Sequence, residues 1–331
     1  MRTIGVIGGS GLYEIEGLTS IERVKLSTPY GEPSDEYIVG QLGDAKVIFL
    51  PRHGRGHRIL PHEINFRANV WGMKKLGVEW ILSVSAVGSL KEEIAPGDIV
   101  IVDQFIDRTK AREASFFGDG VAGHVGFGDP ICSDLAAHVY ASAKQAGAKV
   151  HQGGTYVVME GPMFSTRAES NLYRSWGASV IGMTNLPEAK LAREAEICYS
   201  TIALSTDYDC WHETEEDVSV EAVMAIIRKN VALAKAIVKG SVERIPEKRG
   251  CACQAAAQFA VMTAPEAIPA AGRERLGIIM DKYWSKQKSR MVWSSSARWR
   301  SIRSRPTAPC TMTCSVARRR FSQRRRRTSR R

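Results

Sequence analysis

The sequence predicts an α/β fold, and three observations support this class. Short apolar runs rich in β-branched residues alternate with segments of helical periodicity. The apolar runs are continuous, which is typical of strands buried on both faces of a sheet. No internal repeat and no Pro/Gly-rich linker occurs before residue 245, so one domain over residues 1–284 is the simplest organisation.

The elements follow from these two periodicities. The runs predicted as strands are Thr3–Ile7, Lys46–Leu50, Trp80–Val84, Asp98–Val102, Tyr156–Met159, Ser179–Met183 and Tyr199–Leu204. The predicted helices are Glu63–Leu76, Ser133–Ala146, Ala168–Trp176, Pro187–Glu194, Val218–Lys239, a short Ala-rich helix at Cys251–Val261, and one from Pro269 to about Tyr283. Pro187 suits the first turn of its helix.

Composition excludes several classes of protein. A hydrophobic fraction of 44% and a charged fraction of 24% are ordinary for a globular chain. The seven cysteines are odd in number and scattered, which argues against a secreted disulfide framework. Cys251-Ala-Cys253 offers two ligands where zinc needs about four, so no metal site is predicted. No apolar run reaches the roughly 20 residues of a membrane span, and no signal-peptide region precedes the first strand. We therefore expect a soluble, cytoplasmic protein.

The net charge of +11 belongs to the end of the chain. Residues 285–331 carry 2 Lys, 14 Arg and no acidic residue, which leaves 30 basic and 35 acidic residues, or −5, for residues 1–284. This Arg/Ser-rich tail cannot bury enough apolar surface to form a core, and we expect it to be disordered. Its run Arg324–Arg327 with Trp293 and Trp299 nearby leaves two interpretations open, a nucleic-acid-binding segment or an incidental extension.

Three predicted strands end in residues suited to binding an anion. Gly8-Gly9-Ser10-Gly11 follows the first strand, Arg52-His53-Gly54 the second, and Ser85-Ala86-Val87-Gly88-Ser89 begins at the end of the third. Glycine-rich turns let backbone N–H groups approach an anion, and a guanidinium provides two directed hydrogen bonds. Each segment alone is equally a tight turn or a basic loop, but ligands of open α/β sheets bind beyond the carboxyl ends of strands. Together they predict a phosphate site.

Three later segments add candidate site residues. Phe164, after Gly161-Pro162, offers a ring on which a base stacks, although a lone Phe is more often core. Thr184 could complete the phosphate shell or cap the following helix. Asp207 and Asp209, at i and i+2 on an extended segment, point to one side. Two carboxylates in a shared dry site raise the pKa of one of them, so this pair can donate to a purine N7 and accept from an exocyclic amine. The alternative interpretation of Asp207 and Asp209 is an ordinary polar turn.

These motifs occur in one order and together closely resemble the S-methyl-5′-thioadenosine phosphorylases, a branch of the trimeric purine nucleoside phosphorylase family. The resemblance rests on Gly8–Gly11, Arg52–Gly54, Glu160-Gly161-Pro162 with Phe164-Ser165, Met183-Thr184 and Thr206–Trp211, and Asp103–Thr109 also matches. It covers about residues 3–262. It implies a single nucleoside phosphorylase domain whose central mixed β-sheet forms a distorted barrel flanked by helices.

The resemblance also implies roles for individual residues. The residues that would hold phosphate are Ser10, Arg52, His53, Ser85 and Thr184. Asp207 and Asp209 would face the adenine as the catalytic pair. The residues that would contact the rest of the nucleoside are Phe164, Met183, Val220, Val223, His124 and Met262. Of these, Val220 and Val223 would line a slot for the methylthio group, His124 would come from a neighbouring subunit of a homotrimer, and Met262 would come from the carboxyl-terminal helix.

The implied reaction is phosphorolysis of 5′-methylthioadenosine to adenine and 5-methylthioribose 1-phosphate, with phosphate as co-substrate and no metal or organic cofactor. Two enzymatic alternatives and one binding function stand beside it. A 6-oxopurine nucleoside phosphorylase resembles this chain but carries Asn at the position of Asp207. A nucleosidase that uses water has no use for Arg52. The third alternative is nucleic-acid binding through the basic tail.

Overall fold

The computed structural model describes the chain except residues 10–11, 13, 213–219 and 295–331, and the side chains of 220–230 and 286–294 are also outside the described part. Residues Met1–Lys286 form one compact unit. The described residues form eleven strands in one sheet. The strands are β1 (Thr3–Gly8), β2 (Leu18–Val24), β3 (Tyr37–Leu42), β4 (Ala45–Pro51), β5 (Trp80–Ser89), β6 (Ile99–Ile101), β7 (Gln104–Arg108), β8 (Val150–Gln152), β9 (Thr155–Met159), β10 (Val180–Gly182) and β11 (Cys198–Asp207).

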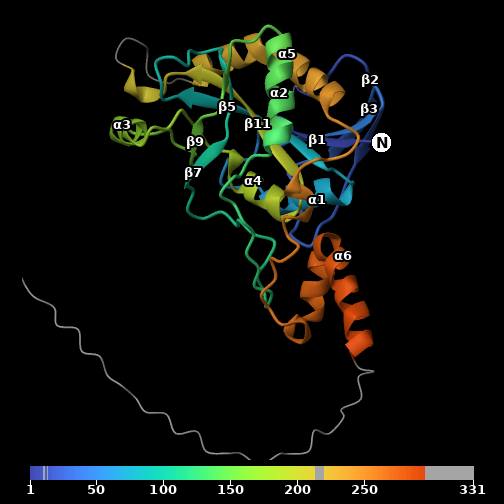
Figure 1. Cartoon of the computed structure of the whole chain (residues 1–331). Coiled ribbons are helices and arrows are strands. Elements are labelled where there is room, and N and C mark those ends of the chain that lie inside the picture. The colour runs from blue at the N-terminus through green and yellow to red at the C-terminus, as the bar shows by residue number, and fades with distance from the viewer. Residues whose placement is uncertain (10–11, 13, 213–219, 295–331) are drawn as a thin grey trace, which may run out of the picture. The chain divides into compact units, whose positions relative to one another are not determined.

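The longest strands, β5 and β11, organise the sheet (Figure 1). β5 pairs in parallel with β1 and β11 and antiparallel with β10. One branch runs β5-β1-β4-β3-β2, and the other two leave β5 through β11 and β10. The sheet is therefore mixed, as predicted.

The two remaining branches of the sheet contain β8 and β9, which are consecutive strands of the chain. β11 pairs with β6 and β6 with β8, and β8 continues after Gly153 and Gly154 into β9, which pairs with β10. Among the described strands no ladder joins β8 to β9, so hydrogen bonding does not close the circuit β5-β11-β6-β8/β9-β10-β5 into the expected barrel, and the chain bends between the two strands. The bend needs glycine: both residues have positive φ, and a Cβ on Gly154 would lie 3.0 Å from the Ser179 Oγ.

Helices cover both faces of this sheet. The helices are α1 (Phe66–Lys75), α2 (Ser133–Gln145), α3 (Arg167–Ser175), α4 (Asn185–Glu194), α5 (Val220–Arg244) and α6 (Ala270–Ser294), with short 3₁₀ turns η1 (Asp209–Trp211), η2 (Ala252–Ala255) and η3 (Pro265–Ala267). Figure 1 shows α2 with α5 on one side of the central strands and α1 with α4 on the other.

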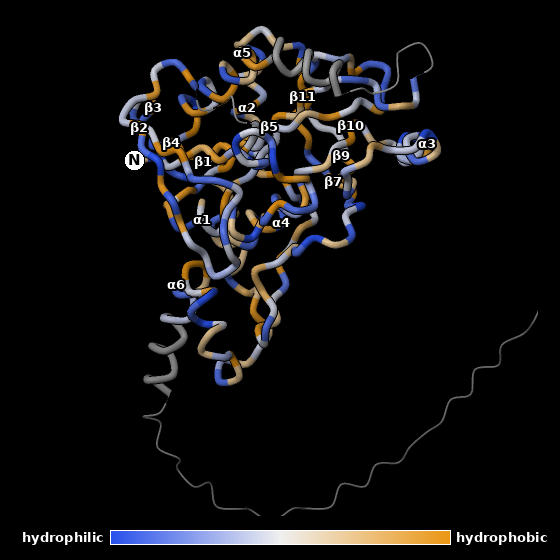
Figure 2. Tube along the Cα trace, turned by 180° about the vertical axis from the view of Figure 1, so that it is seen from behind, coloured by the Kyte–Doolittle hydropathy of each residue, from blue (hydrophilic) through white to orange (hydrophobic). Residues whose placement is uncertain are grey.

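Side chains alternate between two apolar cores because successive strand residues point to opposite faces. Ile4 and Val6 of β1 join the core beneath α2 and α5, whereas Ile7 joins the core with α1, α4 and α6. Figure 2 shows hydrophobic colouring along the central strands and hydrophilic colouring along β2, whose residues are mostly exposed. Among the described helices, none combines the length and apolar character that a membrane crossing requires.

All seven predicted strands and six of the seven predicted helices are present, with shifted ends. The predicted helix Cys251–Val261 is wrong: only η2 is helical there, and Val261 pairs with Gly123 in an isolated β-bridge. High alanine content favours a helix locally, but the segment instead lies across the core with Cys253, Ala257 and Ala260 buried. Met262 therefore lies in an extended segment before α6 rather than in the carboxyl-terminal helix, which corrects that expectation.

Candidate active site

The carboxyl ends of β1, β4 and β5 lie at one edge of the sheet. The parallel registers place Gly8 beside Pro51 and Ile7 beside Ser83, and the Arg52 backbone N–H donates to the Gly8 carbonyl (3.0 Å). Ser10 and Gly11 are outside the described residues, so Ser10 stays a prediction. Arg52 follows the end of β4 as expected, whereas Ser85 lies inside β5, which continues to Ser89 instead of ending at Val84.

Arg52 is fixed by a buried ion pair. Its Nε and Nη2 donate to the two carboxylate oxygens of Glu188 (2.8 and 3.1 Å), and both side chains are at most 3% exposed. The Nη1 group donates to the Val84 carbonyl (3.1 Å). Burial alone lowers the pKa of Arg52, but the adjacent Glu188 carboxylate outweighs it and the net pKa is raised, so the guanidinium stays charged.

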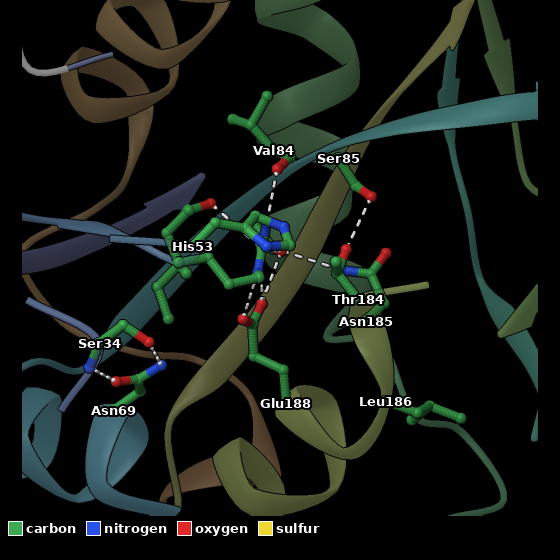
Figure 3. A network of polar contacts seen from close by, with 12 residues as sticks. Ser34, His53, Asn69, Val84, Ser85, Thr184, Asn185, Leu186 and Glu188 are labelled. Atoms are coloured by element: carbon green, nitrogen blue, oxygen red, sulfur yellow. Dashed lines mark hydrogen bonds and ion pairs between the residues drawn. The ribbon is translucent and has the colours of Figure 1, made fainter. Parts of the chain in front are cut away.

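Glu188 belongs to α4 and joins a wider polar network (Figure 3). The Ser83 and Tyr199 hydroxyls both donate to its Oε1 (2.7 and 2.8 Å), and the Asn185 amide donates to Ser83 (2.9 Å). We did not predict this role. From sequence, an acidic residue after Pro187 is typical of an ordinary first helical turn, and nothing local indicates that it faces Arg52.

Ser85 and Thr184 meet beside this network. Their hydroxyls are 3.0 Å apart, the Tyr156 hydroxyl lies 3.1 Å from Ser85, and all three residues are buried. Thr184 stands at the position preceding α4, yet its side chain makes no capping hydrogen bond. The structure thus brings these two candidate phosphate ligands together and gives Thr184 no capping role.

His53 lies next to Arg52 with a defined tautomer. Its Nδ1 lies 2.9 Å from the Ile59 carbonyl, which only accepts, so Nδ1 carries the proton. Its ring stacks on that of His57 at 4.2 Å. Burial lowers the pKa of His53 to about 4, so the imidazole is neutral at neutral pH and its Nε2 is a hydrogen-bond acceptor.

The two aspartates lie where β11 ends. The Thr206 hydroxyl donates to Asp207 Oδ2 (2.7 Å), and the Asp209 N–H donates to Asp207 Oδ1 (2.8 Å). Asp207 is opposite Gly88 of β5, where a Cβ would lie 2.9 Å from its Oδ1. The pair is not on one extended segment as expected: Asp209 has φ +51° and begins η1. The turn, rather than strand alternation, brings Asp209 back toward Asp207.

Burial is the main perturbation of both carboxyl groups. It raises the pKa of Asp207, although the hydrogen bonds from Thr206 and Asp209 oppose this. It raises the pKa of Asp209 to about 6, with a smaller contribution from the Asp207 charge. Asp209 Oδ2 is buried, and the nearby Ser170 side chain lowers the pKa of this carboxyl without reaching Oδ2 in good hydrogen-bond geometry. A ligand amine at this point would satisfy it.

The other predicted site residues are those expected to contact the base, the ribose and the methylthio group. Phe164 is 46% exposed, and Met183 packs over Gly161, where a Cβ would lie 2.6 Å from its sulfur. His124 and Met262 are exposed on the two sides of the Gly123–Val261 bridge. The side chains of Val220 and Val223 lie outside the described residues.

Comparison with known proteins places this geometry in context. Residues 3–243 match the phosphorylase superfamily. The S-methyl-5′-thioadenosine phosphorylase of Geobacter sulfurreducens is 62% identical over 283 residues, which cover 85% of this chain and 99% of that relative. The enzyme of the same name from Hyperthermus butylicus is 50% identical over 78% of this chain and 95% of its own length.

Solved structures agree with these sequence matches. A methylthioadenosine phosphorylase from an antarctic soil metagenomic library superposes with a TM-score of 0.81 at 47% identity, covering 84% of this chain and 98% of that one. The methylthioadenosine phosphorylase of Schistosoma mansoni, in complex with adenine, superposes with a TM-score of 0.74 at 34% identity. It covers 78% of this chain and 99% of that one.

Proposed function

Because the chain belongs to the S-methyl-5′-thioadenosine phosphorylases of the phosphorylase superfamily, we propose that it cleaves 5′-methylthioadenosine with inorganic phosphate. The products are adenine and 5-methylthioribose 1-phosphate, which makes the enzyme a pentosyltransferase of purine and methionine salvage.

One observation carries the proposal: the two polar clusters both adjoin the strand β5. Ser85 belongs to the cluster with Arg52 and Thr184, and Gly88 of β5 is opposite Asp207. Ser85 and Gly88 are about 10 Å apart along the strand, a distance that a ribosyl ring between a phosphate and a purine can bridge. The ring's C1′ would then face phosphate on one side and the base on the other.

At the phosphate end, Arg52 supplies charge, and Ser85, Thr184 and Ser10 supply hydroxyl donors. The ion pair with Glu188 holds the Arg52 guanidinium in one orientation, so phosphate does not have to order this side chain when it binds. His53 Nε2 acts as an acceptor, which suits the P–OH group of hydrogen phosphate. Phosphate would therefore bind as a protonated species.

At the base end, Asp207 donates a proton to N7 and Asp209 accepts from the 6-amino group. Burial that raises the pKa of Asp207 favours its protonated form once the purine has excluded water. Asp209, with a pKa of about 6, is mainly ionised above neutral pH and offers an acceptor. Phe164, Met183, Val220 and Val223 would contact the base, the ribose and the methylthio group.

The chemistry follows from the charge that develops. As the C1′–N9 bond breaks, its electron pair goes to the purine, and the sugar becomes cationic. Asp207 protonates the leaving purine at N7, and a phosphate oxygen forms the new bond to C1′. Phosphate balances the positive charge on the sugar, and the proton from Asp207 balances the negative charge on the purine. We therefore propose that the reaction uses no metal or organic cofactor.

We propose that the enzyme acts as a cytoplasmic homotrimer. The exposed positions of His124 and Met262 suit side chains that complete a neighbouring subunit's site. The five described cysteines form no disulfide, which suits a reducing compartment. Light scattering during gel filtration should give three times the chain mass, and a monomer with full activity would exclude shared sites.

The decisive assay measures adenine release from 5′-methylthioadenosine with and without phosphate. We expect release only with phosphate, together with a stoichiometric sugar 1-phosphate. Full-rate release in phosphate-free buffer would instead identify a hydrolase. Arg52→Lys keeps the positive charge but cannot pair with both oxygens of Glu188, so the cation loses its fixed position. This variant should raise KM for phosphate more than KM for the nucleoside.

The preference for a 6-aminopurine is tested at Asp207. Asn at this position matches a 6-oxopurine, and a donor–acceptor mismatch costs about 1–3 kcal/mol. Asp207→Asn should therefore move the kcat/KM ratio of methylthioadenosine to inosine toward inosine by roughly 5- to 150-fold. An unchanged ratio would refute the assignment of Asp207 to the base.

A further inference from the structure

Four cysteines that are far apart in the sequence meet at the amino-terminal end of β11. Cys198 is the first residue of β11, and Cys132 directly precedes α2. Cys251 directly precedes η2, and Cys253 lies in it. All four Sγ atoms lie within 4.8 Å of one another, and those of Cys198 and Cys251 are 3.3 Å apart. We name this group the four-cysteine cluster.

The distances suit four ligands around one ion. Sulfur atoms bound to tetrahedral zinc at about 2.3 Å lie about 3.8 Å from one another. The sulfur atoms of the cluster are close enough for such a site after small side-chain rotations. The 3.3 Å separation of Cys198 and Cys251 exceeds a disulfide bond, which is about 2.05 Å long.

The surroundings favour a closed, all-thiolate site. Cys132, Cys198 and Cys253 are 4%, 0% and 7% exposed and belong to the apolar core beneath α2 and α5. Cys132 stands at the amino terminus of the 13-residue α2, and its side chain makes no capping bond, so its sulfur is available to an ion. Water and oxygen ligands have little access to such a position.

We propose that Cys132, Cys198, Cys251 and Cys253 bind one structural Zn²⁺ ion. Soft thiolates in a tetrahedral arrangement select zinc over the hard cations Mg²⁺ and Ca²⁺. Four protein ligands leave no open position for substrate, so the ion is structural. Cys198 and Asp207 are the two ends of the ten-residue β11, about 30 Å apart along the strand, so the ion lies far from the aspartates.

The ion would fasten the connector after α5 to the core. Residues 251–253 lead into the segment that carries Met262 and then into α6. Binding to three separate segments stabilises only the folded chain, so metal binding adds directly to its stability. Without the ion, this connector would be held by buried apolar contacts and by hydrogen bonds such as that from the Ala257 N–H to Glu196 Oε1 (2.9 Å) and that from Arg249 to the Glu196 carbonyl (2.6 Å).

The test is metal analysis of the full chain purified under reducing conditions. We expect about one zinc per chain by mass spectrometry of the metal, and X-ray absorption should show four sulfur ligands at about 2.3 Å. Replacement by Co²⁺ should give the visible absorption of a tetrahedral thiolate site. The double variant Cys251→Ser/Cys253→Ser should lose the metal and the Co²⁺ spectrum, and chelation should lower the Tm of the unsubstituted chain but not that of the variant.

Cys210→Ser is the matched control, because Cys210 is a described cysteine outside the cluster, with its Sγ 3.3 Å from the Ser165 carbonyl. It should keep about one zinc per chain. Two results would overturn the proposal: no saturable uptake of one Zn²⁺ by the reduced chain, or disulfides among these four residues in the protein as isolated from cells, detected by mass mapping after alkylation. Neither result bears on phosphorolysis, which is assayed separately.

Discussion

At the scale of single residues, the buried pair Arg52–Glu188 links stability to function. Each side chain is at most 3% exposed, so neither charge has water to replace a lost partner. A buried ion pair adds little to the free energy of unfolding compared with an apolar pair of the same size, but removing one partner lowers this free energy strongly. We therefore interpret Glu188 as a positioning residue for Arg52.

Replacing Glu188 tests this interpretation. Glu188→Gln keeps the shape but leaves Arg52 uncompensated, so the free energy of unfolding should fall by about 3–5 kcal/mol. KM for phosphate should rise more than KM for the nucleoside because the guanidinium loses its fixed orientation. Urea unfolding and steady-state kinetics measure the two effects. Glu93→Gln is the control: Glu93 is 66% exposed, and its loss should change stability by less than about 0.5 kcal/mol.

The raised pKa of Asp209 predicts a pH-dependent stability. Burial raises this pKa from 3.8 to about 6, so between these values the folded chain binds more protons than the unfolded chain. Stability from this group is therefore present at low pH and falls as the pH rises through about 6. Asp209→Asn removes the titration, and Asn tolerates the positive φ of this position.

The expected signature is a difference between two pH values. Relative to the unsubstituted chain, Asp209→Asn should be more stable by about 1 kcal/mol at pH 8 than at pH 5. Other titrating groups cancel because they are common to both proteins. Chemical unfolding at the two pH values measures the difference. An equal effect at both would mean that Asp209 keeps an ordinary pKa.

At the scale of elements, burial on both faces made the central strands predictable. β1, β4, β5 and β11 are buried over most of their length, and the apolar residues in them indicate strands without knowledge of their neighbours. Four strands were missed: β2, β3, β7 and β8. β3 is a buried and mainly apolar strand that we overlooked in the sequence. None of the residues of β2, β7 and β8 is fully buried, so these strands carry no apolar run and depend on pairing with other strands, which no local pattern encodes.

The same limit applies to the site. The strand-end motifs predicted correctly that Arg52 and Asp207 stand at the carboxyl ends of buried strands, whereas Ser85 lies within β5. Glu188 could not be assigned, since its partner lies 136 residues away in the chain. The four-cysteine cluster was missed for the same reason: counting ligands near Cys251 overlooked Cys132 and Cys198, which only the fold brings close.

The helix α6 provides a prediction at this scale. Leu276 is 0% exposed and joins the core with α1 and α4. Leu276→Ala should lower the free energy of unfolding by about 2–5 kcal/mol, because it removes buried methyl groups and leaves a cavity. Glu274→Ala, at an exposed position of the same helix, should have little effect. Equal stability of the two variants in chemical unfolding would mean that α6 does not pack on the core.

At the scale of the whole molecule, charge separates the chain into two parts. Residues 1–284 carry −5, whereas residues 285–331 carry 16 basic and no acidic residues. The relative from Geobacter sulfurreducens is matched over 99% of its length by 85% of this chain, so the rest of this chain has almost no counterpart in that enzyme. Catalysis and any binding of polyanions should therefore be separable.

Deleting residues 285–331 tests this separation. The apolar contacts of Leu276, Ile279 and Trp284 in the core remain, so kcat/KM for methylthioadenosine should change by less than about twofold, equivalent to about 0.5 kcal/mol. Retention on immobilised RNA should be lost, because an acidic body repels phosphates, whereas the full chain should be retained and released as salt rises. Retention is measured by salt elution and activity by adenine release. RNA binding that persists in the shortened chain would place the polyanion site in the body instead of the tail.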